Sequence, residues 1–351
     1  MGGGMRIVVV GATGNVGTSV VECLSRDERV REIIGVARRQ PSWDAPKTRF
    51  VQADVGSDDL APHMEGADAV LHLAWLFQPT HSPLVTWRVN ALGSIRVFDA
   101  AAAAGVRTVL YASSVGAYSP GYGRTVDESW PTHSVPTAAY GREKAYVERV
   151  LDAFEVRHPE IRVVRMRPHF IFKHESASQQ RRLFAGPLLP KFLVRPGMLP
   201  ALPVPAGLRF QALHTSDAAE AYRLALFSDA RGAFNLAADP VIDGAALGEL
   251  LGTRVVAVPR MLLRGALATA WHLHLVPAEP ALLDLTMHLP LLDTMRARTE
   301  LGWVPRYTGI QAMQEMLRGM ADGAGADTPP LTADSLGERV QEVASAVGER
   351  P

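Results

Sequence analysis

The chain has a single cysteine among its 351 residues, Cys23, which excludes an internal disulfide and a cysteine cluster that could bind a metal. Neither sign of charge is in excess, since lysine plus arginine and aspartate plus glutamate each number 36, and this argues against nucleic acid as the main partner. Long uncharged apolar runs are also lacking, because charged residues and prolines interrupt the most apolar stretch, residues 261–292. Residues 1–5 show no apolar segment typical of a secretory signal. We therefore expect a cytoplasmic protein without a membrane partner.

What the sequence does have, near its start, is a short apolar run followed by regularly spaced glycines. Residues 8–10 predict a buried parallel strand, and Gly11, Gly14 and Gly17 lead from it into an amphipathic helix. Glycine lets a ligand approach the backbone closely, and the start of a helix directs unpaired N–H groups and a positive dipole end toward the turn. Strand, turn and helix together predict a site for the diphosphate of a dinucleotide.

The second predicted strand, residues 32–37, bears on which dinucleotide is bound. In a doubly wound sheet its tip faces the adenosine ribose, where an acidic residue suits the 2′-hydroxyl of NAD and an arginine suits the 2′-phosphate of NADP. Here Ala37 takes the place of the acid and is followed by Arg38 and Arg39. The pattern favours NADP over NAD, with a solvated basic turn as the alternative interpretation.

Further strands are predicted at residues 50–55, 69–74 and 108–112, and a long helix at 84–104. Strands and helices alternate without a hairpin signal, which predicts a parallel sheet with helices on both faces: an α/β, Rossmann-type, doubly wound fold. We expect His72, inside one strand, to be a packed core residue. Ligands of such sheets bind at the carboxyl ends of the strands.

A tyrosine and a lysine four residues apart, Tyr140 and Lys144, share one face of a predicted helix. A tyrosine hydroxyl has a pKa of about 10, too high for easy proton exchange at neutral pH, and a nearby lysine cation would lower it. Tyr140 could then act as a general acid or base toward a carbonyl or alcohol oxygen. Ser113 and Ser114 follow the strand at 108–112, so either hydroxyl could orient the same oxygen. A surface Tyr–Lys pair is the alternative.

At this point the chain resembles an extended short-chain dehydrogenase/reductase of the NAD-dependent epimerase/dehydratase group. The resemblance runs from residue 5 to about residue 320 and implies a Rossmann domain with a smaller, discontinuous C-terminal substrate domain. Its motifs, loose singly but specific in this order, are Gly11-x-x-Gly14-x-x-Gly17, Ser113-Ser114-Val115-Gly116-Ala117-Tyr118, Tyr140-x-x-x-Lys144, Arg167-Pro168, His214-Thr215-Ser216-Asp217 and Leu301-Gly302-Trp303-x-Pro305.

The resemblance implies that Tyr140 is the catalytic acid or base, that Lys144 binds the nicotinamide ribose and tunes Tyr140, and that Ser114 rather than Ser113 is the catalytic serine. Expected substrate-binding residues are Ser114, His169 and Arg181, and no metal ligands are expected. The expected cofactor-binding residues are Gly11, Thr13, Gly14, Asn15, Val16, Gly17, Arg38, Arg39, Asp54, Val55, Leu73, Ala74, Tyr140, Lys144, Pro168 and His169.

The same resemblance divides the chain and suggests a partner. The expected nucleotide-binding domain is 5–170 with return segments at about 208–240, and the expected substrate-binding part is 171–207 plus 241–320. Residues 322–351 lack a strong core pattern, so we expect a flexible tail with a short helix near 338–347. A homodimer through the helices at 84–104 and 139–157 is also implied.

Departures from the family pattern leave the reaction open. Val115-Gly116 stands where dehydratases place an acidic pair, which disfavours dehydration of a sugar nucleotide. Sugar-nucleotide epimerases often carry an arginine just before the His-x-x-Asp motif, but Arg209 is slightly out of register. The apolar stretch 183–202 suits a hydrophobic ketone or alcohol equally well. Three hypotheses stand: an NAD(P)-dependent reductase or dehydrogenase with a small-molecule substrate, a nucleotide-sugar epimerase with retained NAD, and a non-catalytic cofactor-sensing protein.

Overall fold

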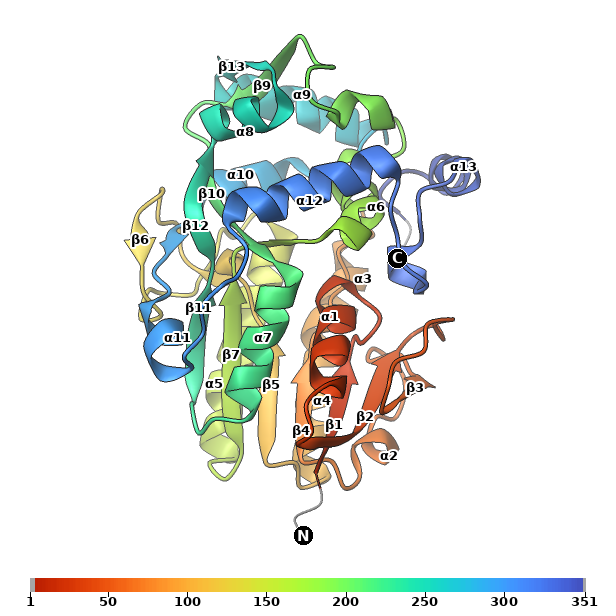
Figure 1. The fold of residues 1–351 in the computed structure, drawn as a ribbon, viewed down its shortest axis with the longest axis vertical. Coiled ribbons are helices and arrows are strands. Elements are labelled where there is room, and N and C mark those ends of the chain that lie inside the picture. Colours follow the sequence, from red (N-terminus) through yellow and green to blue (C-terminus); the bar gives the residue numbers. More distant parts are fainter. Residues whose placement is uncertain (1–3, 350–351) are drawn as a thin grey trace.

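The computed structural model describes residues 4–349 and is organised around a sheet of seven parallel strands, in the order β11-β7-β5-β4-β1-β2-β3 (Figure 1). From β1 the chain runs outward through β2 and β3, then returns to β4 on the other side of β1. This reversal of strand order is where doubly wound sheets bind their ligands. The strands are β1 (Met5–Val10), β2 (Val30–Ala37), β3 (Thr48–Gln52), β4 (Ala69–His72), β5 (Thr108–Ala112), β7 (Arg162–Pro168) and β11 (Gly232–Leu236).

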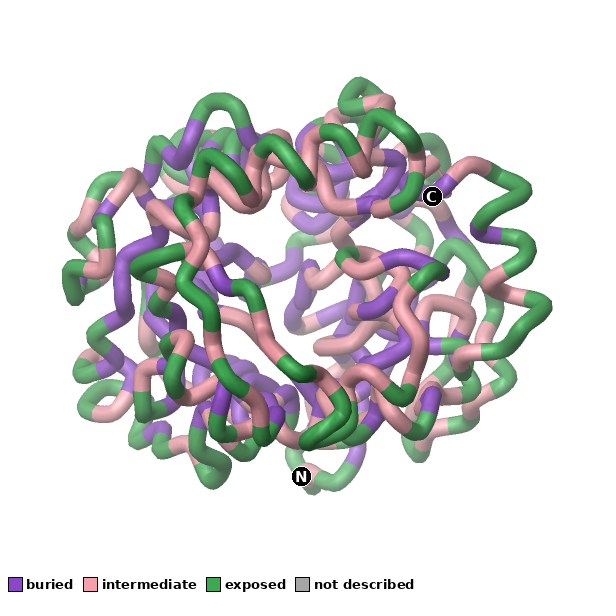
Figure 2. The backbone as a smooth tube through the Cα atoms, turned by 90° about the horizontal axis from the view of Figure 1, so that it is seen from above, coloured by how far each residue is buried: buried purple, intermediate pink, exposed green. Residues whose placement is uncertain are grey.

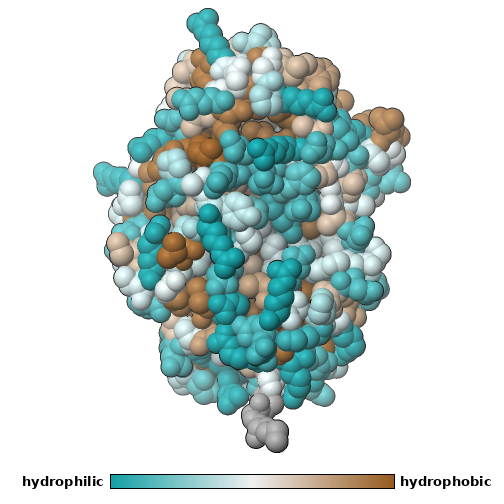
Figure 3. Space-filling model, in the orientation of Figure 1, coloured by the Kyte–Doolittle hydropathy of each residue, from teal (hydrophilic) through white to brown (hydrophobic). Residues whose placement is uncertain are grey.

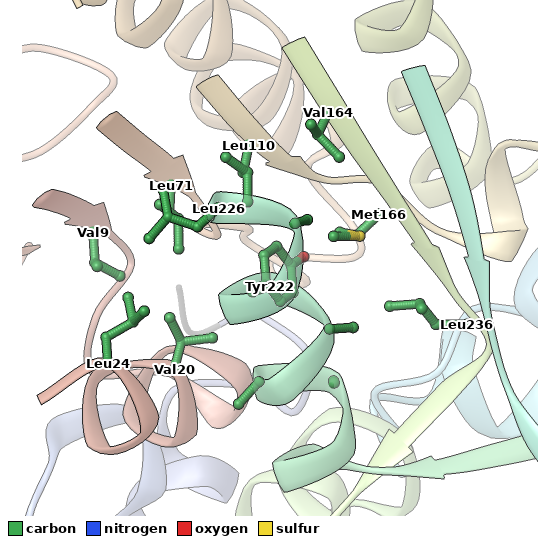
Figure 4. Packing of buried hydrophobic residues seen from close by; sticks show 14 of the residues in the cluster. Val9, Val20, Leu24, Leu71, Leu110, Val164, Met166, Tyr222, Leu226 and Leu236 are labelled. Atoms are coloured by element: carbon green, nitrogen blue, oxygen red, sulfur yellow. The ribbon is translucent and has the colours of Figure 1, made fainter. Parts of the chain in front are cut away.

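Helices cover both faces of this sheet, as alternation of side chains along each strand requires. Ile7 and Val9 of β1 face α1 (Asn15–Ser25) and α7 (Thr215–Leu226), and Figure 4 shows this layer. Val8 and Val10 face the opposite layer of α2 (Ala61–Met64), α4 (Gly93–Ala103) and α5 (Ala139–Arg157). The predicted doubly wound α/β fold is confirmed.

Local expectations hold with shifted boundaries. The expected helix at 84–104 is three consecutive segments, α3 (Pro83–Trp87), η1 (Arg88–Leu92) and α4. His72 is buried in β4, where its Nε2 atom lies 2.8 Å from the hydroxyl oxygen of Ser94. It is a core residue, as its strand position predicted.

A smaller layer of mixed structure lies above the strand ends, at the top of Figure 1. Seen from above in Figure 2, buried stretches lie in the interior and exposed ones follow the rim. No helix within residues 4–349 is long and apolar enough to cross a membrane. The remaining elements are β6 (Thr125–Val126), β8 (Phe170–Phe172), β9 (Ala201–Pro205), β10 (Arg209–His214), β12 (Ala238–Asp243), β13 (Arg254–Val258), β14 (Leu291–Leu292), α6 (Ala177–Gln180), α8 (Gly244–Leu251), α9 (Arg260–His272), α10 (Pro280–His288), α11 (Met295–Glu300), α12 (Gly309–Asp322), α13 (Leu336–Ala344), η2 (Val115–Ala117), η3 (His174–Ser176), η4 (Arg181–Ala185), η5 (Lys191–Val194) and η6 (Pro329–Leu331).

The segment after α12 differs from the flexible tail that the sequence predicts. Its helix is α13, close to the expected position, and it is fastened by buried contacts: Arg181 Nη2 lies 2.7 Å from Glu342 Oε1 and 3.3 Å from Asp334 Oδ1. The hydroxyl of Thr328 donates to the carbonyl oxygen of Thr13 at 2.9 Å. This packing has no apolar core pattern that the sequence could show, because its contacts are ion pairs and hydrogen bonds. Residues 350 and 351 lie outside the described part of the chain.

Candidate active site

A cavity of about 920 Å³ opens at the carboxyl ends of β1, β4, β5 and β7, where the strand order reverses. It brings together nearly all the residues that the sequence singles out, although they come from separate elements. The two expected residues outside its lining are Asp54 and Arg181. Those in the lining are Gly11, Thr13, Gly14, Asn15, Val16, Gly17, Arg38, Arg39, Val55, Leu73, Ala74, Ser113, Ser114, Tyr140, Lys144, Pro168 and His169.

The three glycines of the first turn differ in how much space a side chain would have there. Gly11 has a φ of +89°, and a Cβ there would lie 2.5 Å from the backbone nitrogen of Ala74. A Cβ on Gly17 would come within 2.1 Å of the Gly11 carbonyl oxygen, so both positions need glycine for backbone packing. Gly14 differs, since the nearest atom to its added Cβ is 3.6 Å away. No side chain of the described residues caps the N-terminus of α1. This open cradle with free N–H groups fits a diphosphate.

The end of β2 carries the two arginines into the same cavity. Ala37 is buried, whereas Arg38 and Arg39 are exposed and line the cavity edge. Asp54 instead turns toward its own loop, where a carboxylate oxygen accepts a hydrogen bond from Gly56 N at 2.8 Å. The neighbouring residue Val55 lines the cavity. Of this expected pair, Val55 therefore lies in the lining and Asp54 does not.

Tyr140 stands in the first turn of α5 with its ring against the η2 turn. A Cβ on Gly116 would lie 2.8 Å from the Tyr140 ring, so this glycine permits the close packing. Burial raises the pKa of Tyr140 to about 12, and a hydrogen bond with the Ser114 side chain opposes that rise. Tyr140 is thus a neutral phenol at physiological pH, with a proton available to donate.

Lys144 lies one turn further along α5 and is buried. Its Nζ donates to the carbonyl oxygen of Ala112 at 2.6 Å and sits 3.4 Å from the centre of the Trp75 ring. Burial holds the pKa of Lys144 well below its usual range, and the carboxylates of Glu143 and Glu148 oppose that shift. The contacts of Lys144 are therefore with the end of β5 and an aromatic face. The sequence predicted that it lowers the pKa of Tyr140, whereas the pKa of Tyr140 in this structure is raised.

The two serines after β5 face different partners. Ser113 donates to Glu148 Oε1 at 2.5 Å, and this carboxylate also accepts from Arg167, whose Nε is 2.9 Å from Oε1. Burial raises the pKa of Glu148, but the hydrogen bonds and charge of Arg167 outweigh it and bring the pKa to about 2. Arg165 also contacts this carboxylate. Ser113 thus belongs to a buried charge network, which leaves Ser114 as the serine beside Tyr140.

The remaining expected residues lie farther along the chain. His169 is buried, its Nδ1 accepts from Phe170 N at 3.1 Å, and burial lowers its pKa to about 3, so it is neutral at physiological pH. Arg181 faces the tail, as described, and the adjacent Arg182 lines the cavity in its place. Arg182 also contacts the tail, since its Nη2 donates to the carbonyl oxygen of Pro330 at 2.7 Å.

Sequence reasoning missed several aromatic and sulfur-containing side chains of the lining. Phe77 stacks on the Tyr140 ring with centroids 5.1 Å apart, and Trp75 meets the same ring edge-on at 5.9 Å. Residues 75–78 follow β4 without a motif that would mark them. The three methionines of α12 recur at helical spacing, a signal that was available; they are Met313, Met316 and Met320.

One group outside the cavity was also missed. His81, His274 and Glu349 place ligand-type atoms within 4.8 Å of one another. The His81 and His274 rings lie face to face, with centroids 4.2 Å apart and planes 31° apart.

Comparisons with known proteins show which proteins this chain resembles. An uncharacterized protein of Mycobacterium tuberculosis is 24% identical over 324 residues, covering 89% of this chain and 83% of the relative. Human sterol-4-alpha-carboxylate 3-dehydrogenase, decarboxylating, is 27% identical over 169 residues, 48% of this chain and 44% of the relative. A UDP-glucose-4-epimerase structure from Stenotrophomonas maltophila, with bound NAD and formylated UDP-arabinopyranose, superposes with a TM-score of 0.68 at 21% identity, covering 91% of this chain and 98% of that one.

A second solved structure, MoeE5 in complex with UDP-glucuronic acid and NAD, gives a TM-score of 0.66 at 21% identity and covers 90% of this chain and 99% of its own. At these identities the two structures establish the fold alone. The model of the NAD dependent epimerase/dehydratase family matches residues 7–237, which include the glycine cradle, the serine pair and the Tyr140–Lys144 turn. The chain therefore belongs to the NAD-dependent epimerase/dehydratase family, whose members are NAD-dependent dehydrogenases and epimerases.

Proposed function

We propose that the protein is an NAD(P)-dependent oxidoreductase that interconverts a carbonyl and an alcohol on a small organic or sugar-like molecule. The observation that carries this proposal is the placement of Ser114, Tyr140 and Lys144 on one wall of the cavity that also contains the glycine cradle. The glycine turn and the N-terminus of α1 would hold the diphosphate, and Lys144 the nicotinamide ribose. When bound, the reduced cofactor supplies a hydride.

Tyr140 and Ser114 handle the oxygen of the substrate. In reduction the carbonyl carbon gains a hydride and its oxygen gains the proton of the Tyr140 hydroxyl, so the alcohol forms with atoms and charge balanced. The Ser114 hydroxyl hydrogen-bonds the same oxygen and fixes its position. A Tyr140 pKa of about 12 keeps the hydroxyl protonated at neutral pH, which is the form that donates a proton in reduction.

Arg38 and Arg39 support NADP as the preferred cofactor. Both lie at the cavity edge after Ala37, where no acidic side chain stands to bind a ribose 2′-hydroxyl. Their guanidinium groups would form charge-assisted hydrogen bonds with a 2′-phosphate. We also propose a cytoplasmic location, which rests on the sequence alone.

Cofactor retention separates this proposal from an epimerase. A reductase exchanges its cofactor at each turnover, whereas an epimerase oxidises and re-reduces one substrate with the same NAD. We would titrate the purified protein with NADPH and NADH, following nicotinamide fluorescence, and assay the supernatant after denaturation for carried-over nucleotide. Tight NADPH binding without retained nucleotide is the expected result. Retained NAD, with NADPH bound no better than NADH, would favour the nucleotide-sugar epimerase.

We further propose a homodimer through the outer helices of the sheet. Trp87 of α3 contacts Tyr146 of α5 with ring centroids 4.7 Å apart, so the two helices lie side by side. Beside Trp87, apolar side chains of α3 are exposed: Leu84 by 80% and Val85 by 40%. Light scattering should give twice the 38.0 kDa of one chain. Leu84→Glu should shift the protein toward the monomer mass, and an unchanged dimer would exclude this interface.

A further inference from the structure

Beyond Tyr140 the cavity continues into a chamber whose first wall is aromatic. Phe77 stacks on the Tyr140 ring with an angle of 12° between the planes, and Phe184 meets Phe77 edge-on at 6.1 Å. All three side chains line the cavity. A substrate whose oxygen reaches the Tyr140 hydroxyl would therefore lay the atoms next to that oxygen against aromatic carbon.

The opposite walls of the chamber are aliphatic and come from two helices. Leu282 and Leu285 lie on α10 and Leu289 directly follows it, and the methionines of α12 line the cavity with Phe210 beside them. Methionine side chains are flexible and adapt to irregular apolar shapes. The chamber thus offers a large apolar surface of adjustable contour.

The charged side chains at this end are already paired. Arg182 Nη2 donates to the carbonyl oxygen of Pro330 at 2.7 Å and its Nη1 to that of Thr332 at 2.9 Å, and Glu338 lies 3.5 Å away. Glu342 pairs with Arg181. A substrate diphosphate would need cations that are available to it, and a buried anion without them is costly.

We propose that the natural substrate is a bulky, largely apolar alcohol or ketone without a phosphate group, such as a fused-ring or isoprenoid compound. Its oxygen lies at Tyr140 and its body fills the chamber between Phe77, Phe184, α10 and α12. This inference rests on the proposed oxidoreductase function and narrows its substrate. The binding energy comes from removal of apolar surface from water.

A ring-size series tests the chamber on the whole protein loaded with NADP⁺. Cyclohexanol, decalin-2-ol and androstanol carry one hydroxyl on bodies of increasing apolar size, and UDP-glucose serves as the diphosphate probe. Each alcohol is followed by nicotinamide absorbance and, separately, by its shift of Tm. We expect kcat/KM to rise about tenfold or more from cyclohexanol to decalin-2-ol, because each buried methylene adds to binding. UDP-glucose should neither turn over nor shift Tm.

A pair of phenylalanines supplies the matched variants. Phe184 lines the chamber and Phe192, nearby in the chain, does not; their exposed fractions are 38% and 50%, so neither substitution dismantles the core. Phe184→Glu should lower kcat/KM for androstanol about tenfold with NADPH affinity unchanged. Phe192→Glu should leave both constants as they are.

The outcomes separate the two proposals. Turnover of UDP-glucose in preference to the alcohols, or equal responses of the two phenylalanine variants, would overturn the apolar substrate class and leave hydride transfer standing. Apolar alcohols that raise Tm and lose this effect in Phe184→Glu, but never reduce NADP⁺, would support the chamber and overturn the oxidoreductase function.

Discussion

The cofactor end of the cavity is built largely of backbone, whereas the substrate end is built of side chains from elements far apart in the sequence. At the first end, Gly11, Gly14 and Gly17 lie within seven residues and shape the site by what they lack. At the second, Phe77, Phe184 and the α12 methionines meet only after the whole chain has folded. The contrast shows why a family shares its cofactor while its members differ in substrate.

The contrast extends to the molecular surface. Figure 3 shows a largely hydrophilic face over the sheet, with hydrophobic side chains appearing around the upper part and α13. Leu336, Val340 and Val343 of α13 are exposed by 84%, 67% and 57%. The substrate end therefore carries apolar side chains both in the cavity lining and on the surface of α13.

The largest expected effect is chemical and lies where the two ends meet. Tyr140→Phe removes the transferable proton while keeping the ring that packs on Phe77 and Gly116. We expect kcat to fall about 10³-fold, a typical loss for a general acid, with NADPH affinity unchanged. Stopped-flow absorbance of the nicotinamide checks this.

Tyr146→Phe, on the outer side of the same helix, is the matched control and should keep full activity. If the Tyr140→Phe variant retained the biological activity of the protein, the non-catalytic cofactor-sensing hypothesis would replace the enzyme hypothesis.

The next effect concerns the stability of the cofactor end. Glu148 is fully buried with Arg165 and Arg167, so Glu148→Gln leaves two buried guanidinium groups with less opposite charge. We expect a loss of about 3 kcal/mol in the free energy of unfolding, measured by urea titration. Glu249→Gln, on an exposed site of α8 in the upper layer, should change it by less than about 0.5 kcal/mol. Equal losses of unfolding free energy in the two variants would contradict the expected difference between the two regions.

A smaller effect would distinguish the cofactors. Arg38→Ala removes one charged donor from the edge of the cavity and should weaken NADPH binding about tenfold, because a hydrogen bond to a charged group is at stake. NADH binding should stay the same. Arg31→Ala, exposed near the other end of β2, is the control for lost charge. A parallel loss for both cofactors would show that Arg38 does not recognise a 2′-phosphate.

The smallest effect is expected at the tail. Glu342→Gln weakens one partner of Arg181, which keeps Asp334 at 3.3 Å. We expect a severalfold rise in KM for the apolar alcohol and faster proteolysis after α12, with NADPH affinity unchanged. Glu315→Gln, which alters a more exposed pair with Arg318, is the control. A change confined to NADPH binding would show that the tail acts on the cofactor end and not on the substrate end.

The sequence predicted the first strand, the glycine turn and the first helix well because their determinants are local. A strand, three glycines and a helix are contiguous, and parallel strands bring their carboxyl ends together wherever the loops lead. Asp54 lies outside the lining because its carboxylate accepts a local hydrogen bond from Gly56 N. Sequence periodicity predicts which faces of helices and strands are buried. It does not predict the direction in which the side chain of a loop residue points.

The substrate end was harder to predict because no local pattern encodes it. Residues 75–78 carry two aromatic side chains to Tyr140, yet they follow β4 as irregular chain. Arg181 and Arg182 both contact the tail, through Glu342 and Glu338, and only the folded structure shows that Arg182 alone lies in the lining. Contacts between residues 160 positions apart depend on tertiary packing that composition does not reveal.

The hydrogen bond from Thr328 to the carbonyl of Thr13 also has a consequence for biosynthesis. Domains generally fold as units, and the core beside β1 includes side chains of α7 and β11, so the sheet needs the chain up to residue 236. Residues 328–349 emerge after all seven strands of the sheet, and they supply the partners of Arg181 and part of the cavity wall. The contact with the glycine turn and the part of the cavity wall that residues 328–349 supply can therefore form only after every strand of the sheet has been synthesised.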